Sequence, residues 1–123
     1  MRNFAMIALA ATALAAIPAK HALAQDTPGP AAVVATSEHR SLAIKHTQAA
    51  IDAGKDGSAA GVADHAKQAL THVEAARKDE PGDEKLAAAV KSLENAMAKG
   101  RGGDREGAWK SADEALEKLQ AKS

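Results

Sequence analysis

The sequence predicts an all-α protein, specifically an up-down antiparallel four-helix bundle made of two repeated helical hairpins. Apolar residues recur at helical spacing in four stretches, and glycine or proline breaks separate these stretches. No segment alternates apolar and polar residues as a strand would. The chain also resembles itself after a shift of 46 residues, which indicates a duplicated hairpin. Four amphipathic helices with short loops favour an up-down bundle.

The first segment, 1–24, is predicted to be a cleaved secretory signal peptide. It begins with one positive charge at Arg2, and the apolar run that follows is shorter than the roughly 20 residues of a membrane span. Ala22 and Ala24 form a small-residue cleavage pattern at its end. We therefore expect an exported, periplasmic protein without a membrane anchor after cleavage; the alternative is an uncleaved N-terminal anchor helix.

Segment 25–36 is predicted to be a linker, because it contains the sequence Pro28-Gly29-Pro30. The bundle then occupies 37–123. Its predicted units are hairpin one (37–78), with helices over 37–53 and 58–78, and hairpin two (83–121), with helices over 83–99 and 104–121.

The helix ends carry recognisable capping residues. Ser58, Asp83 and Asp104 stand where N-caps belong, and Gly54 and Gly100 stand where C-caps belong. The apolar stripes between them predict the core: Val62, Ala66, Ala69, Leu70, Val73, Leu86, Val90, Leu93, Met97, Ala108, Ala112, Leu116 and Leu119.

Composition excludes several functions. Cleavage would remove Arg2 and Lys20 from the 16 basic residues, leaving 14 against 16 acidic residues and a net charge of −2. A nucleic-acid partner needs a basic surface and stacking aromatics, but the chain has one Trp and no Tyr. The absence of cysteine excludes thiolate ligands and thiol catalysis. We expect a monomer that is not an enzyme, since no serine–histidine pair has a third group to orient the base.

Four histidines outside the signal segment form a symmetric pattern. His39 and His46 lie seven residues apart on the first predicted helix, and His65 and His72 lie seven apart on the second. Seven residues span about 10.5 Å along a helix, which is too far for two histidines of one helix to bind one ion. The turn is centred between residues 55 and 56. His46 and His65 lie at equal distances on either side of this centre, and so do His39 and His72. In an antiparallel hairpin His46 should therefore face His65, and His39 should face His72.

Imidazoles that converge in this way can bind a divalent transition metal, so His39, His46, His65 and His72 are the predicted metal ligands. Copper(II) is favoured by the general order of affinities, and zinc(II) or nickel(II) are possible. Glu38, Asp64 or Gln68 could add a ligand only with favourable rotamers. The alternative interpretation is that the four histidines are boundary residues of the bundle with no ligand.

The stretches "AIKHTQAAIDAGKDG" and "DHAKQALTHVEAA" resemble the repeats of the small metal-binding proteins. The resemblance extends over about 38–120. It implies a periplasmic four-helix bundle that binds or sequesters copper and other divalent metals, and it assigns that role to the four histidines alone.

Hairpin two departs from the family pattern. The positions 46 residues after the four histidines are Lys85, Ser92, Ser111 and Lys118, so hairpin two has no histidine at any of them. We therefore expect binding by hairpin one only. The alternative function is a non-metal helical interaction or stress-related module that has kept the fold and lost most metal binding. Trp109 lies at the edge of the apolar stripe of the fourth predicted helix, where it is either a packing residue or an anchor for a docking partner.

Overall fold

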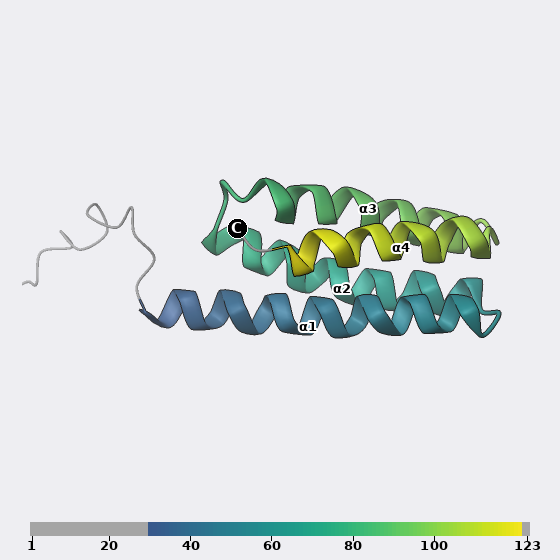
Figure 1. Ribbon diagram of the computed structural model, residues 1–123, viewed down its shortest axis with the longest axis horizontal. Coiled ribbons are helices and arrows are strands. Elements are labelled where there is room, and N and C mark those ends of the chain that lie inside the picture. Colours follow the sequence, from purple (N-terminus) through teal and green to yellow (C-terminus); the bar gives the residue numbers. More distant parts are fainter. Residues whose placement is uncertain (1–29, 122–123) are drawn as a thin grey trace, which may run out of the picture.

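A computed structural model describes residues 30–121 and arranges them as an up-down four-helix bundle (Figure 1). The helices are α1 (Pro30–Lys55), α2 (Ala59–Asp79), α3 (Glu84–Arg101) and α4 (Arg105–Gln120). This range contains no strand, so the predicted all-α class is confirmed. Within it, no helix combines the length and the apolar character that a membrane crossing requires. The predicted signal segment 1–24 and the first part of the predicted linker, 25–29, lie outside the described residues.

Helix α1 begins at Pro30, seven residues before the predicted start at residue 37. The prediction of a linker is therefore wrong for residues 30–36. Pro30 was interpreted as a helix breaker, but at the first position of a helix its missing N–H is not needed and its fixed φ is already helical. As a result α1 has 26 residues and spans about 39 Å, whereas α4 has 16 residues and spans about 24 Å.

The three predicted N-caps are confirmed. The Ser58 hydroxyl accepts a hydrogen bond from the Gly61 N–H at 2.9 Å, and Asp104 accepts one from Gly107 at 2.9 Å. Asp83 accepts two, from the backbone N–H groups of Lys85 at 2.8 Å and Leu86 at 3.1 Å. These bonds satisfy N–H groups that have no partner inside the helix, and so they fix where α2, α3 and α4 begin.

Gly54 and Gly100 are not C-caps, in contrast to the prediction. Both lie inside the last turn of a helix, and the glycines with positive φ come three residues later, at Gly57 (φ 102°) and Gly103 (φ 81°). Gly54 lets Trp109 of α4 pack directly on the α1 backbone, and a Cβ added at Gly54 would overlap the indole side chain. Gly100 does the same for α2, because a Cβ there would lie 2.7 Å from the Ala59 carbonyl oxygen.

The core lies between helices that approach each other closely. Each helix packs against its two neighbours around the bundle, and α2 also approaches α4 across the diagonal. Most core side chains are alanines, with a few larger residues that are also fully buried: Val62, Val73, Leu86, Leu93 and Leu119. The predicted apolar stripes are confirmed, except that three of their larger members pack at the edge of the core: Leu70, Met97 and Leu116. Small core residues permit short distances between helix axes, toward about 8 Å.

Candidate metal centre

The four predicted ligand histidines lie along the seam between α1 and α2. His39 and His46 belong to α1, His65 and His72 belong to α2, and each is neither fully buried nor fully exposed. This half-buried position follows from the sequence, because each histidine stands at the border of an apolar stripe. The alanines of the stripe, among them Ala43, Ala50 and Ala69, are fully buried and bring the two helices together beneath the imidazoles.

His39 and His72 are in direct contact across the seam. Their Nδ1 atoms are 3.2 Å apart and their ring centroids are 5.5 Å apart. Two nitrogen ligands of one ion, each about 2.0–2.1 Å from it and separated by an angle between a right angle and the tetrahedral angle, are about 2.9–3.4 Å apart. The two Nδ1 atoms therefore already have the separation of a chelating pair. At this distance the two rings form a hydrogen bond when one carries its proton on Nδ1 and donates it to the Nδ1 of the other.

His46 lies between His65 and His72. Its ring centroid is 6.3 Å from that of His65, as the equal distances from the turn predict, but it is 5.6 Å from that of His72, with the two rings nearly parallel at 6°. The contact with His72 was not predicted. Side chains lean toward the N-terminus of their own helix, so in an antiparallel hairpin His46 and His72 lean toward each other. The four imidazoles thus form one continuous row rather than two separate pairs.

The environment of the row keeps some nitrogens available. Partial burial lowers the pKa of His72 below its usual value, and positive charge on His46 and His39 would lower it further. The Nδ1 atom of His65 is buried and has no hydrogen-bond partner among residues 30–121. A neutral imidazole with a free nitrogen is the form that binds metal.

Among the described residues, no third histidine, cysteine or carboxylate side chain completes either pair. No group of three or more histidine, cysteine, aspartate or glutamate residues converges within 30–121 in a way that could hold one ion. Glu38 and Asp64, which were considered as further ligands, are exposed and belong to no such group. An ion between His39 and His72 would therefore have two protein nitrogens, and water would supply its remaining ligands.

In hairpin two, the ammonium group of Lys99 lies beside Ser111, one of the four positions that correspond to the histidines of hairpin one. Ser111, which corresponds to His65, is buried and accepts a hydrogen bond from Nζ of Lys99 at 3.0 Å. The loss of histidine at Ser111 is visible in the sequence, but the contact with Lys99, which lies seven residues after Ser92 on α3, is not. A fixed positive charge beside Ser111 opposes the binding of a cation there.

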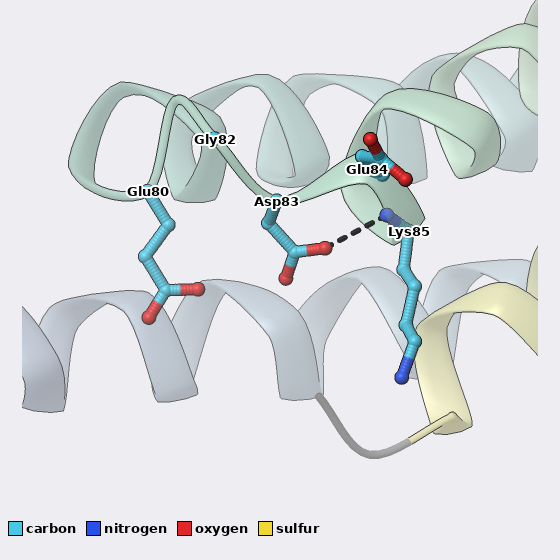
Figure 2. A pocket seen from close by; sticks show the side chains of 5 residues that line it. All are labelled: Glu80, Gly82, Asp83, Glu84 and Lys85. Carbon is cyan, nitrogen blue, oxygen red and sulfur yellow. Dashed lines mark hydrogen bonds between the residues drawn. The ribbon is translucent and has the colours of Figure 1, made fainter.

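A hollow of about 550 Å³ lies at the end of the bundle where α2 connects to α3. Its lining residues are Glu80, Gly82, Asp83, Glu84 and Lys85, and Figure 2 shows the carboxylates of Glu80 and Asp83 directed toward the ribbon of α1. Asp83 is not free to bind a metal, because it caps α3 and also accepts a hydrogen bond from the Arg40 guanidinium at 2.6 Å. The contact between Arg40 and Asp83 was missed by sequence reasoning, since nothing in the sequence identifies the partner of an arginine 43 residues away.

Comparison with known proteins identifies the family of the chain. The family model of the small metal-binding proteins matches residues 3–122, and the chain belongs to this family. No curated protein matches the chain. The resemblance described from the histidine stretches is thereby confirmed, and with it the general function of metal binding.

Proposed function

We propose that the protein sequesters a divalent transition metal, copper(II) in the first place and zinc(II) or nickel(II) as alternatives, between α1 and α2. The observation that carries the proposal is the 3.2 Å separation of the Nδ1 atoms of His39 and His72. This distance matches two ligands of one ion without any movement of the helices. For both Nδ1 atoms to bind the ion, each neutral ring would carry its proton on Nε2, so that the two Nδ1 lone pairs are free for the metal.

Copper(II) is the preferred ion for two reasons. Imidazole ligands suit copper, nickel and zinc, and among first-row divalent ions copper(II) binds most tightly to a given set of nitrogen and oxygen ligands. A site with two imidazoles and open positions for water also suits the tetragonal geometry of copper(II). His46 and His65 form the second candidate pair; their ring centroids, 6.3 Å apart, require a small rotamer change before both rings reach one ion.

The proposed location is the periplasm. The support for it is the N-terminal segment 1–24, whose charged start, apolar run and cleavage pattern are typical of an export signal. An exported protein with no cysteine and a row of imidazoles would act there as a metal binder or scavenger rather than as an enzyme.

Calorimetric titration with copper(II) tests the proposal. The variant His39→Ala/His72→Ala should bind at least about tenfold more weakly than the unchanged protein, a loss of about 1.4 kcal/mol or more, because it lacks the preformed pair. The matched control is Gln48→Ala/Thr71→Ala, which replaces one exposed polar residue on each of the same helices and should bind normally. Equal affinity of the histidine variant and the control would refute the proposal.

A further inference from the structure

The N-terminal part of α1 extends beyond the end of α4. Because α1 is ten residues longer than α4, it extends past the end of α4, where α2 and the α2–α3 connection lie beside it, and its first turns extend beyond α2 as well (Figure 1). His39 lies near this end of the bundle, whereas His46 lies farther inside it. The position of His39 relative to His72 therefore depends on what fixes this end of α1.

Two polar contacts fix it, one helical turn apart. The Thr36 hydroxyl donates a hydrogen bond to Asp79 at 3.1 Å, and Nη2 of Arg40 donates one to Asp83 at 2.6 Å. We call these four residues the clasp. Thr36 is three residues before His39 and Arg40 is the residue directly after it, so the two attachment points enclose this ligand.

The Arg40–Asp83 contact has the features of a strong ion pair. The side-chain exposure is 21% for Arg40 and 10% for Asp83, so the pair is partly shielded from water. Asp83 cannot move far, because it also caps α3 through two backbone N–H groups. Glu80 adds a second carboxylate 3.6 Å from the same guanidinium nitrogen. Short, charge-assisted contacts of this kind are roughly twice as strong as neutral hydrogen bonds.

We propose that Arg40 is a positioning residue of the metal pair: by holding α1 against Asp83, it presets the distance between His39 and His72 at which both bind one ion. This inference rests on the proposed function. Chelation tolerates little error, because a shift of about 1 Å takes the two nitrogens outside the roughly 2.9–3.4 Å separation of adjacent ligands of one ion. Without the clasp the end of α1 would fray, and metal binding would have to order it again.

The test uses copper(II) and a background of His46→Ala/His65→Ala, so that His39 and His72 are the histidine pair whose copper(II) binding is measured. In this background Arg40→Met keeps the unbranched apolar stem of the side chain but removes its charge and its hydrogen-bond donors. The expected result is an approximately tenfold weaker affinity and a copper(II) paramagnetic resonance spectrum with one coupled imidazole nitrogen in place of two. Arg40→Lys should restore much of the affinity, since an ammonium also pairs with Asp83. Thr36→Val, which removes the other contact of the clasp, should weaken binding in the same direction.

A purely electrostatic role of Arg40 gives the opposite result. Loss of a positive charge beside the site would strengthen cation binding, so Arg40→Met would then bind copper(II) more tightly. The matched control is Lys110→Met, which removes the cation of the exposed pair with Glu106 and should change neither affinity nor spectrum. Circular dichroism shows whether each variant keeps its helices at the temperature of the titration.

The outcomes separate the two proposals. If the background protein binds no copper(II), the proposed function fails and this inference fails with it. If the background binds and Arg40→Met binds equally or more tightly with two coupled nitrogens, the positioning role of Arg40 alone is overturned.

Discussion

His72 lies between two other imidazoles and is the histidine most affected by its surroundings. Its Nδ1 contacts that of His39, and its ring stacks on that of His46. Partial burial and the neighbouring histidines lower its pKa, so the folded protein favours the neutral form. The same property that costs stability in acid keeps a ligand nitrogen available to metal near neutral pH.

This pKa shift predicts how the stability of the metal-free protein depends on pH. The unfolded chain has the ordinary pKa of 6.5 for His72 and so binds more protons than the folded protein as the pH falls below this value. The free energy of unfolding should therefore be fully retained above about pH 6.5 and should decrease as the pH falls further. Thermal melts with a chelator at about pH 7.5 and pH 5.5 measure this, and His72→Gln should show a smaller decrease in Tm. A Tm that is equal or higher at the lower pH would contradict the expected sign.

Part of the candidate site could be predicted at the residue scale. Equal distances from the turn predicted that His39 faces His72, because in an antiparallel hairpin such positions have the same height. The stacking of His46 on His72 could not be predicted from distances to the turn, since it depends on the tilt of each side chain toward the N-terminus of its own helix. The ion pair of Arg40 with Asp83 depends on how the second hairpin sits on the first, which no local pattern contains.

At the scale of the elements, capping chemistry predicted where helices begin more reliably than where they end. Ser58, Asp83 and Asp104 act as N-caps because their side chains offer an acceptor that only a helix start requires. Glycine has two separate uses, so its position is ambiguous. Gly54 was expected to end a helix with positive φ, but Gly57 has that conformation and Gly54 instead provides space for a neighbouring helix.

Substitution of Gly54 tests this account of helix packing. Gly54→Ala should destabilise the protein by up to about 2 kcal/mol, because the new methyl group overlaps Trp109 at a cost of about 1–3 kcal/mol and helix propensity offsets only about 1 kcal/mol of it. Urea unfolding followed by the fluorescence of Trp109, the only tryptophan in the chain, measures the change.

Gly82→Ala is the control for that measurement. A Cβ at Gly82 meets nothing within 4 Å, so this variant should unfold at nearly the same urea concentration as the unchanged protein. If Gly54→Ala behaves like Gly82→Ala, the close approach of α1 and α4 is not required for stability.

At the scale of the whole molecule, the repeat relates the two hairpins in packing as well as in sequence. A shift of 46 residues carries Gly54 onto Gly100 and Ala63 onto Trp109. The contact of Gly54 with Trp109 between α1 and α4 thus corresponds to the contact of Gly100 with Ala63 between α3 and α2. The fold is retained in both copies, whereas the histidines are present only in the first.

Hairpin two should gain a metal site only if its lysine is also replaced. Ser92→His/Ser111→His restores imidazoles at the positions of His46 and His65, but the Lys99 ammonium beside Ser111 would still repel a cation. We expect one additional equivalent of copper(II) when Lys99→Ala is combined with both histidine substitutions, and little gain without it. Calorimetric stoichiometry distinguishes the two variants; an unchanged stoichiometry in the triple variant would contradict the correspondence of the hairpins.

The most direct test of the central claim is a crystal structure of the copper(II)-loaded protein, with the ion located by its anomalous scattering. The structure should place an ion about 2.0–2.1 Å from the Nδ1 atoms of both His39 and His72, with water at its remaining positions and little movement of α1 or α2. An ion bound elsewhere, or bound to only one of these two histidines, would contradict the account.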